Sequence, residues 1–144
     1  MQPPPTGTTR TAAITAVTTV AIPVADQERS LAFYPEMLGF EKRRDVPFGP
    51  GRRWIEVGPP GSTTTIALPP RGDATPGVDT GIRLGTRDAG ADHAALRERS
   101  VDVDAELFRV GPGVPPMFSF RDPDGNTLYV VEELPGGAAQ PTTR

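Results

Sequence analysis

The residues that could do chemistry in this chain are few and lie far apart. Glu56 is the best candidate for a general base, because a partly desolvated carboxylate has a raised pKa; a solvated strand residue is the alternative. Asp79 and Arg83, four residues apart, predict a structural ion pair along one strand, with a catalytic pair as the alternative. Trp54 and Tyr129 could stack on a flat or cationic group, although Trp54 could equally serve sheet packing or a dimer contact.

The residue inventory excludes several classes of protein. With no cysteine and one histidine, the chain cannot build a disulfide framework, a structural zinc site, an iron–sulfur site or a cysteine nucleophile. His93 shares a helical stripe with Ala89 and Leu96, so we predict a packing residue rather than a catalytic base.

Charge and hydropathy restrict the partners and the location. The formal net charge of -3 argues against a nucleic-acid partner, which needs a basic face. Apolar runs such as residues 20–22 are far shorter than the ~20 residues that span a bilayer, and the N-terminus does not have the build of a signal peptide. We therefore expect a cytoplasmic protein without a membrane partner.

The elements that must position these residues form a pattern that occurs twice. The first copy begins with a β-branched run over residues 14–24 and continues with an N-cap at Asp26 and a helix that Pro35 should kink or break. Strands over 40–45, 52–57 and 63–68 follow, separated by Gly/Pro turns. The second copy has a strand over 79–84, an N-cap at Asp88, a helix through Arg99, and strands over 101–108, 117–121 and 126–132.

Three landmarks recur at nearly one offset. The two N-caps are 62 residues apart, the Gly-Pro-Gly turns at 49–51 and 111–113 are also 62 apart, and Gly61 and Gly125 are 64 apart. The spacing predicts an α+β fold of two βαβββ modules, about 14–70 and 77–134, in a single domain over 14–134. Pro/Gly/Thr-rich segments at 1–13 and 135–144 are predicted to be flexible tails.

Three motifs carry a resemblance to a known family: Val20-Ala-Ile-Pro-Val-Ala-Asp26, Ser30-Leu-Ala-Phe-Tyr34 with Leu38-Gly-Phe40, and Phe120-Arg-Asp-Pro-Asp-Gly-Asn126. Together they make the chain similar to the vicinal oxygen chelate family, which includes glyoxalases, extradiol dioxygenases, fosfomycin-resistance enzymes and bleomycin-resistance proteins. The resemblance implies the glyoxalase/bleomycin-resistance fold, in which the modules form a curled mixed sheet around a concave cup.

The resemblance also implies where a divalent metal ion would bind. The four ligand positions of the metal-dependent members fall on Thr19, Ala67, Asp79 and Tyr129. Only Asp79 has a side chain suited to such an ion, whereas a catalytic site needs about three protein ligands. We therefore expect no metal cofactor, with Asp79 as the single weak candidate ligand.

Strand alternation assigns side chains to the cup, because successive residues point to opposite faces. Together with the family positions it predicts a cup lined by Thr19, Trp54, Glu56, Ala67, Asp79, Arg83, Ser119, Arg121 and Tyr129. A mostly apolar and aromatic lining with a few polar groups suits a small organic molecule.

The leading hypothesis is a metal-independent protein that binds such a molecule by sequestration or as a carrier, as bleomycin-resistance proteins do. A cationic aromatic ligand would find counter-charge at Glu56 and Asp79. The alternative is an enzyme of the superfamily, a lyase, isomerase or dioxygenase with a non-standard site. A third alternative is an interaction module whose cup is a subunit surface. The resemblance also implies a homodimer.

Overall fold

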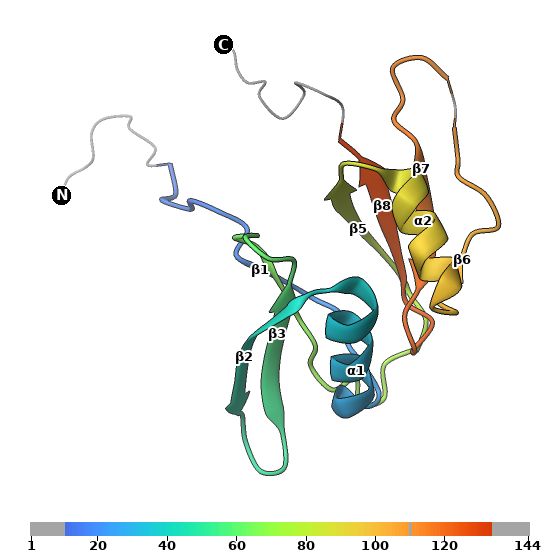
Figure 1. Cartoon of the computed structure of the whole chain (residues 1–144). Helices are drawn as coiled ribbons and strands as arrows, with labels where there is room; N and C mark the ends of the chain where they lie inside the picture. The colour runs from blue at the N-terminus through green and yellow to red at the C-terminus, as the bar shows by residue number, and fades with distance from the viewer. Residues whose placement is uncertain (1–10, 110, 134–144) are drawn as a thin grey trace.

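The computed structural model describes residues 11–109 and 111–133, and shows two modules of the same topology (Figure 1). Within the predicted tails, residues 1–10 and 135–144 lie outside the described residues. No helix in the described part of the chain has the length and apolar character needed to cross a bilayer.

The first module is a four-stranded sheet with one helix. Along the chain it contains β1 (Thr19–Ala21), α1 (Gln27–Leu38), β2 (Glu41–Pro47), β3 (Arg53–Gly58) and β4 (Thr65–Ala67). The strand order is β1-β4-β3-β2, with β1 parallel to β4 and the other neighbours antiparallel.

The second module repeats this arrangement. Its elements are β5 (Asp79–Thr86), α2 (Ala89–Glu98), β6 (Asp102–Val103), β7 (Met117–Arg121) and β8 (Thr127–Glu132). The strand order β5-β8-β7-β6 matches that of the first sheet position by position, including the parallel pair β5 and β8. The predicted α+β duplication of βαβββ units is therefore confirmed.

Both helices begin where the sequence predicts. The Asp26 carboxylate accepts hydrogen bonds from the backbone N–H groups of Glu28 and Arg29, and the Asp88 carboxylate accepts one from Ala91. These contacts satisfy N–H groups that a helix start otherwise leaves without partners. The predicted break at Pro35 is wrong, since α1 continues through this residue as far as Leu38.

Two predicted strands are much shorter than expected. Only residues 19–21 of the run 14–24 form β1, and residues 11–18 are almost entirely exposed. Of the run 101–108, only Asp102 and Val103 form β6. The regular ladder is interrupted at the next residue: the Asp104 N–H still donates to the Ser119 carbonyl, but the Ser119 N–H donates at 2.8 Å to the Asp104 side chain instead of to a backbone carbonyl.

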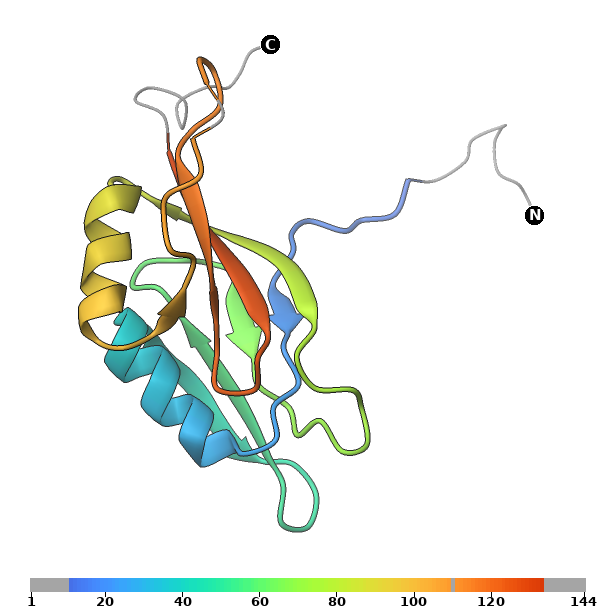
Figure 2. The same ribbon diagram turned by 90° about the vertical axis from the view of Figure 1, so that its right-hand side faces the viewer.

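The two modules share one hydrophobic core. Alternate residues of the central strands point into it, among them Ile55 and Val57 of β3 and Phe120 of β7, all without exposed surface. Figure 2 shows α1 and α2 next to each other on one side of the molecule. The helix ends are in contact, since Arg99 Nη1 donates to the Met37 carbonyl at 3.2 Å. The faces of the sheets that turn away from this core carry the predicted site residues.

Candidate functional site

The outward face of the first sheet carries a hydrogen-bonded group around one carboxylate. Trp54 Nε1–H donates to Glu56 Oε2 at 2.7 Å, and the Thr65 hydroxyl lies 2.8 Å from Glu56 Oε1. The Thr19 hydroxyl lies 3.2 Å from that of Thr65. A carboxylate can only accept, so Thr65 gives its one proton to Glu56 and receives the proton of Thr19. We call Thr19, Trp54, Glu56 and Thr65 the first-sheet cluster.

This cluster corrects the prediction for Glu56. The hydrogen bond from Trp54 lowers the pKa of the Glu56 carboxyl, helped by Thr65 and by the positive charge of Arg44, and outweighs the opposing effect of burial. The expected raised pKa is therefore wrong. Glu56 is an ionised acceptor at neutral pH and orients the Trp54 ring through its hydrogen bond.

The Trp54 ring also contacts an aromatic neighbour. Phe48, in the turn between β2 and β3, lies edge-on to it with ring centroids 5.7 Å apart. A ring held by a hydrogen bond and by an aromatic neighbour loses little further freedom on binding a ligand. The face of the first sheet therefore presents a preorganised indole.

The second sheet carries a separate group formed by Asp79, Arg83 and Tyr129, the second-sheet cluster. The Tyr129 hydroxyl donates to Asp79 Oδ2 at 2.6 Å, and the Gly81 N–H donates to Asp79 Oδ1 at 3.0 Å. The Arg83 guanidinium carbon lies 4.3 Å from the centre of the Tyr129 ring, a cation–π geometry. The predicted ion pair of Asp79 with Arg83 is wrong, because Asp79 binds the Tyr129 hydroxyl while Arg83 stacks on the ring of the same tyrosine.

These contacts set the protonation of both Tyr129 and Asp79. The hydrogen bond from Tyr129, and then that from the Gly81 N–H, lower the pKa of the Asp79 carboxyl. The same bond to Asp79 raises the pKa of the Tyr129 phenol. At neutral pH the pair therefore consists of a carboxylate and a neutral phenol.

The last two predicted residues bind a third acidic group. Ser119 donates to Asp104 from both its backbone N–H and its hydroxyl, and Arg121 donates to the same carboxylate at 3.1 Å. Arg121 also pairs with Asp102 at 3.1 Å. Burial would raise the pKa of the Asp104 carboxyl, but the Ser119 and Arg121 donors outweigh it and lower the pKa. The donors that Ser119 and Arg121 could offer a ligand are thus already partly used.

The structure places the predicted residues on both sheets. Among the described residues, no hydrogen bond or ion pair joins the first-sheet cluster to the second-sheet cluster. Ala67, in register with Glu56, is fully buried and offers no surface to a ligand. His93 is also buried, against Phe118, as predicted, with Nε2 2.7 Å from the Asp104 carbonyl oxygen.

Sequence reasoning missed Thr65 and Asp104, although a signal for both was present. Thr65 lies two residues before Ala67 on the same strand, so alternation assigns it to the same face. Asp104 follows Asp102 by two residues in a run where Val101 and Val103 alternate with the acids. Both side chains could therefore have been assigned to the outward face.

The donor set does not fit a divalent metal ion of the kind that the resemblance implies. Of the four family positions, Ala67 has no donor atom, the Thr19 hydroxyl binds Thr65, and the Tyr129 hydroxyl donates to Asp79. Within residues 11–109 and 111–133, no three His, Cys, Asp or Glu side chains are close enough to hold a metal ion. One carboxylate is well below the usual ligand number.

Comparison with known proteins assigns the family. A family model described as the Glyoxalase/Bleomycin resistance protein/Dioxygenase superfamily matches residues 16–130, and the chain belongs to this superfamily. A crystal structure of a superfamily member from Sphaerobacter thermophilus is 39% identical, with a TM-score of 0.78 over 85% of this chain and 100% of that one.

Two further relatives are informative. TnmS3, an antibiotic binding protein from a Streptomyces species, is 34% identical, with a TM-score of 0.71 over 86% of this chain and 100% of that one. The uncharacterized protein YetH of Bacillus subtilis is 28% identical over 116 residues, which is 79% of this chain and 95% of YetH. The predicted family and fold are thus confirmed.

Proposed function

We propose that the protein binds a small organic molecule with an aromatic part on the outward faces of its sheets, without a metal ion, and acts by sequestration or as a carrier. The observation that carries the proposal is the first-sheet cluster. Each oxygen of Glu56 accepts one hydrogen bond, and the bond from Trp54 holds the indole in place, which is a geometry suited to binding a flat group. The antibiotic-binding relative at 34% identity supports the same class of function.

The charges on these faces favour particular ligands. Glu56 and Asp79 remain ionised because donors lower the pKa of both carboxyl groups. A cationic aromatic molecule could therefore stack on Trp54 and be attracted by these carboxylates. Arg83, stacked on Tyr129, adds a flat surface of its own on the second sheet.

We further propose that the protein is a homodimer in which the first-sheet face of one copy lies opposite the second-sheet face of the other. Within one chain the two clusters lie on different sheets, so each sheet face carries only part of the predicted lining. In a dimer with two-fold symmetry, the first-sheet face of each copy would lie against the second-sheet face of the other, which creates two equivalent sites. A cytoplasmic location stays a prediction.

Fluorescence of Trp54, the only tryptophan, tests the binding proposal directly. The protein is dialysed against EDTA and titrated with proflavine, a planar cation, and with metal-free bleomycin. We expect saturable quenching by at least one of them, weakened about tenfold in Glu56→Gln, which keeps the shape and loses the charge. Chemical conversion of the bound probe, seen by mass spectrometry, would favour the enzyme instead, and no saturation with either probe would overturn the proposed ligand class.

A further inference from the structure

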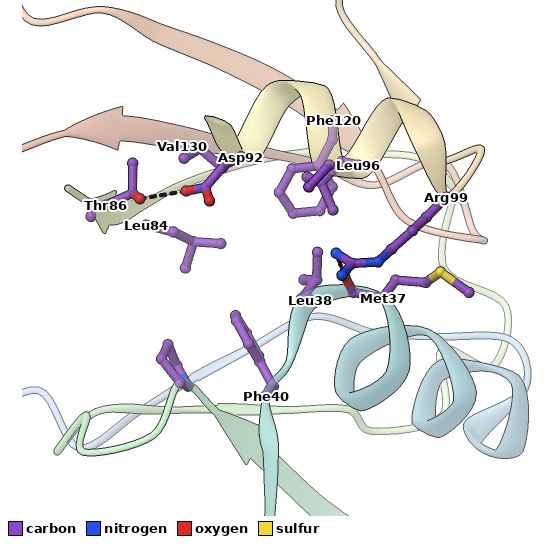
Figure 3. A pocket seen from close by; sticks show the side chains of 13 residues that line it. Met37, Leu38, Phe40, Leu84, Thr86, Asp92, Leu96, Arg99, Phe120 and Val130 are labelled. Carbon is purple, nitrogen blue, oxygen red and sulfur yellow. Dashed lines mark hydrogen bonds between the residues drawn. The ribbon is translucent and has the colours of Figure 1, made fainter. Parts of the chain in front are cut away.

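A cavity lies between the two modules on the core side of the sheets (Figure 3). No residue of either cluster lines it. Its volume is about 210 Å³, and it is bordered by the end of α1, by β5 and by α2. Phe120 and Val130 line it, whereas their chain neighbours Ser119 and Tyr129 point to the opposite face of the second sheet. A molecule in this cavity would therefore not be the ligand of the outward faces.

Most of the residues that border the cavity have apolar side chains, and they come from both modules. They include Leu38, Phe40, Leu84, Leu96, Phe120 and Val130. Sites for drug-sized ligands usually have volumes of several hundred Å³, and this cavity is smaller. It therefore suits a small apolar group such as one aromatic ring. The volume and lining of the cavity thus favour a ligand whose apolar part is about the size of one aromatic ring.

One end of the cavity carries a negative charge. Asp92 of α2 extends toward it in Figure 3, and the Thr86 hydroxyl donates to Asp92 Oδ2. The other oxygen, Oδ1, has no hydrogen-bond partner among the described residues, and Asp92 forms no ion pair there. Glu132 lies close by, since its carboxylate accepts the Ala89 N–H at the start of α2. This end therefore attracts a cation.

The positive group at the other end is already engaged. Arg99 donates to the Met37 carbonyl near the C-terminus of α1, and it is the C-cap residue of α2. Helix C-termini carry partial negative charge, which offsets the charge of this guanidinium. Asp92 lies in the first turn of α2, so the positive end of that helix offsets part of its charge in the same way. What distinguishes the two ends is hydrogen bonding, since Asp92 Oδ1 is a free acceptor within the described part of the chain whereas Arg99 is already bound to the Met37 carbonyl, and a donor such as an ammonium group is therefore favoured near Asp92.

We propose that this cavity is a second binding site, for a small organic amine whose ammonium group donates to Asp92 Oδ1 and whose apolar body lies among Leu84, Leu96 and Phe120. It is independent of the proposed function, because the two sites lie on opposite faces of the second sheet.

Benzylamine, protonated at neutral pH, is the probe, and benzyl alcohol is its neutral counterpart of similar shape. Titrations of the full chain followed by amide NMR should show saturable shifts at Leu84, Leu96 and Val130, with benzyl alcohol about tenfold weaker. Asp92→Asn, which keeps a side chain that Thr86 can bind, should remove this preference. Equal binding of the two probes, or no effect of Asp92→Asn, would overturn the proposal.

A matched pair of variants tests the location. Ala95 lines the cavity, while its neighbour Ala94 is exposed on the same helix and does not line it. Ala95→Met should fill the space and abolish benzylamine binding, and Ala94→Met should leave it unchanged, with circular dichroism confirming that both variants fold. The fluorescence of Trp54 should not respond to benzylamine. A fluorescence response together with an unchanged amide signal of Leu96 would place the amine on the outward face and contradict the second site. This outcome does not depend on whether proflavine binds.

Discussion

The Tyr34 hydroxyl, on the helix of the first module, donates a 2.9 Å hydrogen bond to the Asp122 carboxylate in the last turn of the second module. Both residues are buried. Asp122 also accepts from the backbone N–H groups of Asp124 and Asn126 and from the Asn126 side-chain amide. The Asp-Pro-Asp-Gly-Asn turn thus orders itself around one carboxylate, and Tyr34 connects it to the other half of the chain.

Replacing Tyr34 by phenylalanine should lower the free energy of unfolding by about 1–2 kcal/mol, because a buried carboxylate oxygen loses one of its donors and keeps Asn126. Urea denaturation followed by circular dichroism measures the difference. Tyr129→Phe is the matched control, since the bond from its hydroxyl to Asp79 is exposed to solvent and its loss should change stability by less than about 0.5 kcal/mol. Equal stability of Tyr34→Phe and the unsubstituted protein would contradict the role of this contact.

Protonation of Glu56 should be visible in the fluorescence of Trp54 as the pH falls. The donors lower the folded-state pKa of Glu56 below the ~4.3 of an unperturbed glutamate, so its stabilising contribution is present above that value and is lost as the pH falls through the folded-state pKa. The fluorescence transition of the folded protein should therefore have a midpoint below ~4.3. In Thr65→Val, which removes one donor, the midpoint should rise; a midpoint above the unperturbed value in the unsubstituted protein would refute the assignment.

The sequence predicts the helix starts and the directions of several side chains, but it does not predict which side chains are in contact. The cap residues Asp26 and Asp88 were identifiable because capping depends on a few adjacent residues, and the outward direction of Trp54 and Glu56 follows from alternation alone. The partner of Asp79 was not identifiable, because Arg83 is near in the chain whereas Tyr129, 50 residues away, comes close only through the parallel pairing of β5 with β8. The local sequence pattern predicts to which face of a sheet a side chain points, whereas the pairing of distant strands decides which side chains come into contact.

Divalent metal ions should not bind tightly at the family positions, since Asp79 is the only one of the four with a carboxylate or imidazole side chain. Titration of EDTA-treated protein with Mn²⁺, Ni²⁺, Zn²⁺ and Fe²⁺, followed by calorimetry and elemental analysis, should give no stoichiometric ion. Proflavine binding should be the same before and after EDTA treatment. Stoichiometric metal that is lost in Asp79→Ala would reverse the metal-independent proposal.

Sedimentation equilibrium should give twice the mass of one chain if the two kinds of sheet face complete each other between copies. In that case Tyr129 of one copy and Trp54 of the other border one site, and either Trp54→Ala or Tyr129→Ala should weaken proflavine binding. A monomer that binds proflavine with full affinity would show that one face is sufficient.

The separation of the two outward faces has a consequence for engineering. Each face is held by its own hydrogen bonds on its own sheet, so randomising the first-sheet cluster leaves Asp79, Arg83 and Tyr129 in their native arrangement. Libraries can thus be built on one half and recombined with libraries on the other. Under the proposed function, the selectivity for a ligand would then depend on two surfaces that can be adjusted separately.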